Sequence, residues 1–143
     1  MTRLYFNVKM HRANIYQTIQ EQMDTSKKLC LKWKDFQENI NTSFGSLRDN
    51  HDFADVTLAC DEGQQVIGHK FILASSSPVF RDILKTNGHA HTYIYMRGVK
   101  LVDLVAIMDF LYFGKSNILQ DNLEGFLSIA EELGLKGLTG EKN

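Results

Sequence analysis

The chain of 143 residues has few of the features that mark disulfide-rich, membrane or secreted proteins. Its two cysteines, Cys30 and Cys60, lie far apart and form no CxxC motif. We therefore expect reduced, buried thiols of an intracellular protein and not a disulfide framework. No apolar run approaches the ~18–20 residues of a membrane span. No segment combines a charged start, an apolar centre and a small-residue cleavage site, so we expect neither a membrane span nor a secretory signal.

Positive charge is scarce over most of the chain. Residues 1–28 contain five Lys and Arg against two Asp and Glu, a net charge of +3, whereas residues 29–143 contain eleven against fifteen, a net charge of −4. A surface that binds nucleic acid needs clustered positive charge to neutralise phosphates. The acidic balance of the main body therefore predicts no direct contact with nucleic acid.

Motifs for catalysis and for cofactor binding are also absent. The stretch His69–Phe80 (HKFILASSSPVF) has a histidine and three serines, but the chain has no GxSxG turn to expose a nucleophile. Ser77 is instead a good helix N-cap, because Pro78 follows at the first helical position, where its missing N–H costs nothing. His89 and His91 have no nearby Cys, Asp or Glu to complete a metal site, and no glycine-rich phosphate loop is present. We expect no enzyme activity, no metal and no cofactor.

A short alternating strand followed by an apolar stripe at helical spacing lies near the start of the main body. The strand positions are Leu29, Leu31 and Trp33, and the helix positions are Phe36, Ile40, Phe44 and Leu47. On a single chain this stripe would form an exposed apolar patch, and such patches usually mark an interface. The pattern therefore predicts a protein-binding surface here.

The remaining apolar patterns predict a hairpin, a pair of helices, a third strand and two further helices. The expected strands are 55–60, 65–69 and 92–96, and the expected helices are 71–75, one that begins at Pro78, 100–113 and 123–133. In helix 100–113 the expected apolar face consists of Leu101, Leu104, Val105, Met108, Leu111 and Tyr112. Gly114 and Gly134 end the last two helices. This order predicts an α+β domain with helices packed around a small sheet.

Residues 1–28 differ in charge from the rest of the chain. Ile15, Ile19 and Met23 are spaced by four, which is typical of a short amphipathic helix. No acidic residue precedes Glu21, so a mitochondrial presequence is one interpretation of the segment. The other is a mobile extension, with Met23 as a candidate start of a shorter form. We favour the extension.

Five motifs, in the same order, resemble those of the BTB/POZ domain. They are Phe53–Leu58 (FADVTL), Gly68–Lys70 (GHK), Leu73–Phe80 (LASSSPVF), Asp109–Gly114 (DFLYFG) and Ala130–Leu133 (AEEL). The start LCLKWKDFQENI and the end ELGLKGLT are similar to the Tramtrack-type subgroup found in insect transcription factors. The resemblance implies an N-terminal extension (1–28), a BTB/POZ domain (29–139) and a C-terminal tail (140–143). It also implies the fold, a small and mainly three-stranded sheet with clustered helices.

The same resemblance implies a protein-interaction domain that forms a strand-exchanged homodimer. The first strand would pair with the partner's sheet and the first helices would pack together, so the seven strand and helix residues named above would form the dimer interface. Tramtrack-type domains also assemble beyond dimers and mix with one another, usually in nuclear proteins. The expected partners are therefore the chain itself, other Tramtrack-type BTB proteins and co-regulators. By motif position, Asp55 and Lys70 would pair in a charged pocket near the dimer floor.

Three functions fit this resemblance, and we favour an oligomerisation domain of a nuclear transcription regulator. The alternative is a substrate adaptor for a cullin-based ubiquitin ligase. Adaptors typically use an apolar-x-Glu motif after the helix that contains Phe80, together with an added helical extension, and residues 85–93 contain no acid. A cytoskeletal or channel-type assembly module is the third.

Overall fold

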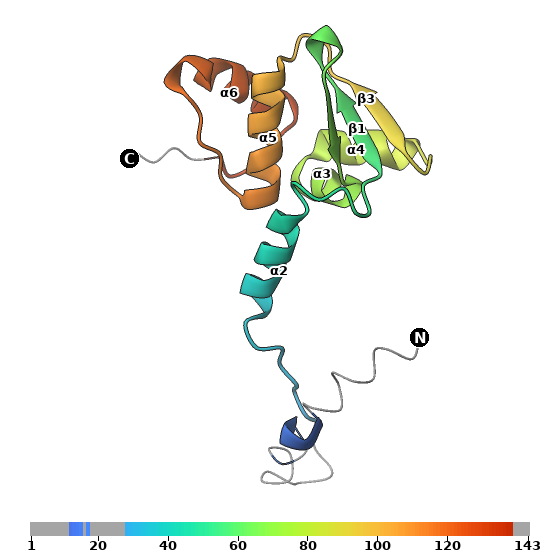
Figure 1. The fold of residues 1–143 in the computed structure, drawn as a ribbon, viewed down its shortest axis with the longest axis vertical. Coiled ribbons are helices and arrows are strands. Elements are labelled where there is room, and N and C mark those ends of the chain that lie inside the picture. The colour runs from blue at the N-terminus through green and yellow to red at the C-terminus, as the bar shows by residue number, and fades with distance from the viewer. Residues whose placement is uncertain (1–11, 16, 18–27, 139–143) are drawn as a thin grey trace. The chain divides into compact units, whose positions relative to one another are not determined.

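The computed structural model describes residues 12–15, 17 and 28–138 (Figure 1). The chain divides into two units between Lys34 and Asp35. In the first unit, residues 12–15 and 17 are helical, which is part of the expected amphipathic helix. The other two positions of that pattern, Ile19 and Met23, lie outside the described residues.

The strand expected over Leu29–Trp33 is wrong for the single chain, because residues 28–33 have no regular secondary structure. A strand is held by hydrogen bonds to a neighbouring strand. Within the described residues the only sheet contains the three strands β1, β2 and β3, and none of them pairs with this segment. The alternating pattern is thus typical of a strand, but no neighbouring strand in the described part of the chain is available to pair with it.

The sheet consists of β1 (Val56–Ala59), β2 (Gln65–Gly68) and β3 (Thr92–Tyr95), in the order β2-β1-β3. β1 and β2 form the expected antiparallel hairpin, joined by the short 3₁₀ helix η2 (Asp61–Gly63). β3 lies parallel to β1 on the other side, so the chain must cross over between them. The predicted small three-stranded sheet is therefore confirmed, with shorter strands than the sequence suggested.

The described part of the second unit also contains five α-helices and a second 3₁₀ turn. They are α2 (Phe36–Ser46), α3 (Lys70–Ser76), α4 (Pro78–Thr86), α5 (Leu101–Phe113), η3 (Gln120–Asn122) and α6 (Leu123–Glu132). The Ser77 hydroxyl accepts a hydrogen bond from the Phe80 N–H at 3.1 Å, so the expected N-cap of α4 is confirmed. Gly114 ends α5 with φ of 74°, a left-handed conformation that glycine adopts without strain.

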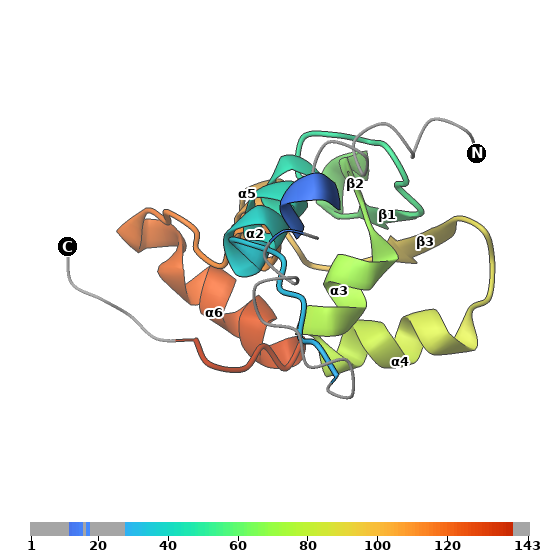
Figure 2. The ribbon, with the colours of Figure 1, turned by 90° about the horizontal axis from the view of Figure 1, so that it is seen from below.

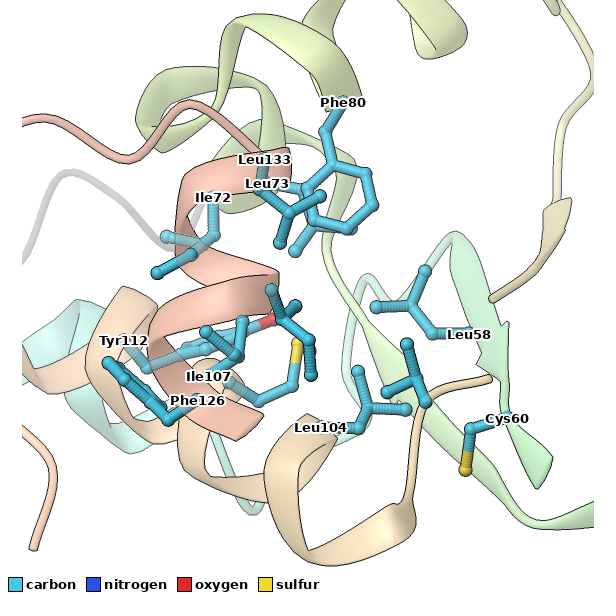
Figure 3. Close-up of a cluster of buried hydrophobic side chains, with 14 of the residues drawn as sticks. Leu58, Cys60, Ile72, Leu73, Phe80, Leu104, Ile107, Tyr112, Phe126 and Leu133 are labelled. Carbon is cyan, nitrogen blue, oxygen red and sulfur yellow. The ribbon is translucent and has the colours of Figure 1, made fainter. Parts of the chain in front are cut away.

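The core lies where the sheet meets α3, α4, α5 and α6. Figure 3 shows side chains from all these elements pointing into one cluster, with Leu58 from β1, Phe80 from α4 and Leu104 from α5 among them. Figures 1 and 2 place α5 and α6 to one side of the sheet, and α5 contacts β2. The core side of α5 differs in part from the expected face, because Ile107 is buried while Val105 is only half-buried.

Candidate interaction surface

The apolar stripe of α2 is divided between the core and the surface. Phe44 and Leu47, near the end of the helix, are partly buried and pack against the core. Ile40 is half-buried, and Phe36 at the start of the helix is 50% exposed. The N-terminal half of α2 therefore presents apolar side chains that this single chain covers incompletely.

The C-terminal end of α2 is attached to α5 by two contacts. The Arg48 Nε donates to Asp109 Oδ1 at 2.8 Å, and this ion pair is only partly exposed. Gly45 faces the ring of Phe113, because a Cβ at Gly45 would lie 3.1 Å from Phe113 Cδ1. A glycine in mid-helix costs roughly 0.5–1 kcal/mol relative to alanine, and here it lets the aromatic ring approach the backbone.

Phe71 extends this apolar surface from α2 onto α3, which the sequence analysis missed. Its ring meets that of Phe44 edge-on, with 5.9 Å between ring centroids, while most of the Phe71 side chain is exposed. Its neighbours Ile72 and Leu73 are buried. Because successive helical residues point in different directions, three adjacent large apolar residues in a short helix could have signalled that one lies outside the core.

Among the described residues of the first unit, the predicted strand residues are the most exposed large apolar side chains. Leu29, Leu31 and Trp33 are 54%, 69% and 62% exposed. They belong to the first unit, and the stripe of α2 belongs to the second. The structure therefore describes two apolar sets, each by itself, and their role in an interface stays a prediction.

A stretch with an open backbone follows α5. Among the described residues, none of 115–118 takes part in a hydrogen bond between backbone groups. Beside it lies a hollow of about 180 Å³ with mixed walls. Its apolar lining includes Val105, Ala106, Ile118 and Leu119, and its polar lining consists of Asp109, Ser116, Asn117 and Asn122. This segment has the two features that an added strand needs, free backbone groups and pockets for side chains.

Asp55 and Lys70 are neighbours, but their charges are not paired in the expected way. The Asp55 carboxylate accepts the backbone N–H of Lys70 at 2.7 Å, whereas the Lys70 ammonium donates to the carbonyl of His89. Lys70 is the first residue of α3, so the carboxylate stabilises the positive end of that helix. The contact that the sequence predicted between side chains is made through the main chain instead.

His69 has a hydrogen-bond partner for each of its ring nitrogens. Nε2 must donate to the carbonyl of Asp52 at 2.8 Å, because a carbonyl only accepts. Nδ1 is then the acceptor for the Tyr112 hydroxyl at 2.6 Å, and the same oxygen accepts the His69 backbone N–H at 2.9 Å. Burial raises the pKa of Tyr112 to about 12, and the hydrogen bond from His69 opposes this rise. These hydrogen bonds give His69 a structural role.

The remaining polar candidates form no chemical centre in the described part of the chain. The His91 ring nitrogen Nε2 bonds the Thr57 hydroxyl at 2.7 Å, and no group of three or more His, Cys, Asp or Glu there could hold a metal ion. None of the described helices is long and apolar enough to cross a membrane. Cys60 is buried as expected, and burial raises the pKa of its thiol, but Cys30 is exposed, contrary to expectation.

The model of one protein family matches residues 44–141, and its description is "BTB/POZ domain". The chain belongs to the BTB/POZ family. The matched region contains β1, β2 and β3 and only the last three residues of α2, together with Asp55, Lys70 and the surface around Phe71. Membership supports a protein–protein interaction domain over an enzyme.

Relatives from Drosophila melanogaster confirm the resemblance to Tramtrack-type domains. The "Longitudinals lacking protein-like" is 44% identical over 116 residues, which cover 81% of this chain and 91% of that protein. The "Broad-complex core protein isoforms 1/2/3/4/5" are 40% identical over 120 residues, and "Protein tramtrack, alpha isoform" is 36% identical over 114 residues. The matches cover 84% and 80% of this chain, but only 16% and 14% of those two relatives.

Solved structures confirm the fold. The BTB domain of human gigaxonin has a TM-score of 0.63 at 23% identity, and that of zebrafish PATZ1 has a TM-score of 0.65 at 19% identity. Each comparison covers 76% of this chain and 89% of the other.

Proposed function

We propose that the chain is the oligomerisation domain of a nuclear transcription regulator and that it forms a homodimer through α2 and the segment before it. The observation that carries this proposal is the incomplete cover of the α2 stripe, where Phe36 is half exposed and Ile40 half-buried. A second copy that packs on this stripe would remove the apolar surface from water. Full burial of a large apolar side chain contributes roughly 1.5–3 kcal/mol, and two copies double the number of residues involved.

The strand positions Leu29, Leu31 and Trp33 supply the second half of the proposed interface. They alternate, so in a strand they would lie on one face, and they are exposed in the single chain. The open backbone of residues 115–118 in a partner is the acceptor that we propose for this strand. Its hydrogen bonds would then turn residues 28–33 into the strand that the single chain lacks.

The choice of partners and of compartment rests on the relatives. "Protein tramtrack, alpha isoform" and the "Broad-complex core protein isoforms" match this chain over the same kind of domain. The resemblance to Tramtrack-type domains supports a nuclear transcription factor whose domain assembles with itself and with related domains. We accordingly propose a nuclear protein whose partners are its own copies, other Tramtrack-type BTB proteins and co-regulators.

We still propose that Asp55 and Lys70 form the charged pocket. Asp55 is fixed by the start of α3, while the Lys70 ammonium makes an exposed contact, with the carbonyl of His89 as its partner among the described residues. This leaves the lysine able to turn toward an acidic group of a partner. In this proposal the pocket acts through Lys70, with Asp55 as its support.

Light scattering coupled to size exclusion tests the dimer. The wild-type chain should have twice the monomer mass at micromolar concentration. Ile40→Asp should lower that mass or unfold the protein, because it places a charge in the apolar contact and an obligate dimer often has no stable monomer. The matched control is Thr42→Asp, on the exposed opposite side of α2, which should remain dimeric. A wild-type chain that is a well-folded monomer by circular dichroism and light scattering would disprove the proposal.

A further inference from the structure

α6 has a second row of apolar side chains, on a side that does not face the core. Its inner side is buried through Phe126, Ile129 and Ala130. Leu123 and Leu127, by contrast, are 44% and 42% exposed, and because they are four residues apart they are neighbours on the helix surface. The outer side of a surface helix is usually polar. The inner row already attaches α6 to the core, so the outer leucines need another explanation.

Two further exposed side chains extend this row beyond the start of α6. Leu119, just before η3, is 74% exposed, and Val102, in the first turn of α5, is 51% exposed. Both line the hollow beside residues 115–118, and so does Asn122, which directly precedes Leu123. We call the four apolar residues Val102, Leu119, Leu123 and Leu127 the leucine surface. In Figures 1 and 2, α6 lies on the side of α5 away from the sheet. Exposed apolar patches of this kind usually mark an interaction site.

Exposed carboxylates accompany the leucine surface, without a cation near them in the sequence. Residues 116–135 contain four acidic residues and no lysine or arginine. All four are exposed, and within the described part of the chain none of them forms an ion pair. Glu124 directly follows Leu123, and Glu131 lies one turn beyond Leu127. The surface is therefore apolar in its middle and negatively charged beside it.

These properties restrict what can bind to the leucine surface. An added strand would find no hydrogen-bond partners on α6, because the backbone groups within an α-helix are bonded to one another. The leucine surface of another copy would bring carboxylates against carboxylates, which repel each other. A helix fits, since side chains four residues apart on one helix pack between those of another. Positive charge on that helix would complement the unpaired carboxylates.

We propose that the leucine surface binds an amphipathic helix of a partner protein, with apolar residues at every fourth position and lysine or arginine beside them. The apolar residues pack against Leu123 and Leu127, and the cations meet Glu124 and Glu131. Recognition of an amphipathic helix through regularly spaced apolar anchors is a common mode of binding. The contact is too short for the roughly 1,200 Å² that a stable interface buries, so we expect weak and reversible binding. It lies apart from the α2 stripe, so it goes beyond the proposed dimer and does not rest on it.

A synthetic helix tests the proposal on the full chain. The probe is a fluorescein-labelled peptide of about 16 residues, mainly alanine, with leucine at every fourth position and a lysine after each leucine. Fluorescence anisotropy at ~50 mM salt should give a dissociation constant of about 10–100 µM, as expected for a weak contact. The same peptide with glutamate in place of lysine should not bind. Binding of both peptides alike, or of neither, would overturn the proposal.

Substitutions in α6 locate the site of binding. Leu127→Ser should raise the dissociation constant of the lysine peptide at least about tenfold, whereas Leu127→Met, which keeps an apolar side chain, should change it less than about twofold. Glu131→Gln should raise it about threefold at ~50 mM salt, and less at ~500 mM salt, where charges are screened. The matched control is Glu132→Gln, because Glu132 is also exposed but is rotated by about 100° around the helix from Glu131. Equal effects of the two glutamine substitutions, or unchanged binding to Leu127→Ser, would refute the assignment.

Light scattering without the peptide separates this surface from the proposed dimer. Leu127→Ser should leave the mass of the wild-type assembly unchanged, because Leu127 belongs neither to α2 nor to the hollow beside residues 115–118. A lower mass would mean that a second copy covers the leucine surface, and the partner helix would then be wrong. If the wild-type chain is a monomer and still binds the lysine peptide as expected, the dimer proposal alone fails.

The N-terminal segment of the chain is the other candidate occupant. Residues 1–28 have a net charge of +3, and Ile15 and Ile19 are spaced by four. The full chain with both Ile15→Ser and Ile19→Ser should bind the lysine peptide as wild type does. Tighter binding would identify the segment as a competitor for the leucine surface and would overturn the proposal of a partner protein.

Discussion

At the scale of single residues, the hydrogen bonds of His69 explain why a histidine and a tyrosine are buried together. The ring of His69 connects the Asp52 carbonyl, in the segment between α2 and β1, to Tyr112 in α5. A buried polar group that loses its partner costs ~1–3 kcal/mol. The arrangement therefore fixes the segment before β1 only while each of the three groups is present.

Tyr112→Phe should lower the free energy of unfolding by about 1–3 kcal/mol, because it leaves the His69 N–H and Nδ1 without partners in the core. Urea denaturation at pH 7 measures the change. Tyr95→Phe is the control, since that side chain is mostly exposed, and it should be neutral. Equal stabilities of the two variants would contradict the assigned hydrogen bonds.

The raised pKa of Tyr112 predicts a loss of stability in alkaline solution. Tyrosine ionises near pH 10 in the unfolded chain, whereas the pKa of Tyr112 in the folded protein is about 12. The folded state thus keeps its proton longer, so stability is unaffected below pH 10 and falls between pH 10 and pH 12, by about 2–3 kcal/mol at most. Urea titrations at pH 9, 10 and 11 should show the advantage of wild type over Tyr112→Phe shrinking. A constant difference would argue against a raised pKa.

At the scale of elements, Ser77 connects α4 to the end of α6. Its hydroxyl accepts from the Phe80 N–H and donates to the Leu133 carbonyl at 2.6 Å. Ser77→Ala removes a helix cap and a second buried bond, so we expect a loss of ~1–2 kcal/mol in thermal or urea unfolding. Ser75→Ala, at an exposed position in the same stretch, should change stability by less than ~0.5 kcal/mol. Similar losses for both would mean that the cap has no special role.

Gly68 of β2 packs tightly against Met108 of α5. A Cβ at this position would lie 2.8 Å from Met108 Cε, in the core. Gly68→Ala should therefore destabilise the protein by ~1–3 kcal/mol through overpacking. Adding Met108→Leu, which shortens the side chain, should recover part of the loss in urea unfolding. Gly88→Ala is the control, because no atom lies within 4 Å of its added Cβ. Additive losses for Gly68→Ala and Met108→Leu would contradict this explanation.

Local patterns predicted the elements well and their contacts less well. The cap at Ser77 and the glycine after α5 were predictable because the responsible residues are adjacent in sequence. The core side of α5 was not, since Leu101–Phe113 is apolar on nearly every side and periodicity alone then selects no face. The strand predicted over residues 28–33 is wrong for a similar reason. A strand needs a neighbouring backbone to pair with, and the sequence pattern does not show whether one is present. The ammonium of Lys70 donates to the carbonyl of His89, nineteen residues away, and no spacing rule indicates such a contact.

At the scale of the whole molecule, the division at Lys34 and Asp35 separates two parts of the proposed interface. Removing residues 1–22 should leave the dimer unchanged, whereas removing residues 1–33 also removes the exposed Leu29, Leu31 and Trp33. We expect the longer deletion to raise the dimer dissociation constant at least about tenfold, equivalent to ~1.4 kcal/mol. Analytical ultracentrifugation measures it, with the shorter deletion as the control. Identical constants would show that the segment takes no part in association.

The position of β1 in the middle of the sheet also orders the events of folding. Its partner on one side, β2, follows after a single turn, but on the other side Val56 pairs with Thr92, which the ribosome adds thirty-six residues later. Contacts between residues distant in sequence form slowly, because a long loop must first close. In the nascent chain the hairpin and α3 can therefore form while one side of β1 is still vacant. A newly made copy therefore cannot complete its sheet until Thr92–Tyr95 have been synthesised.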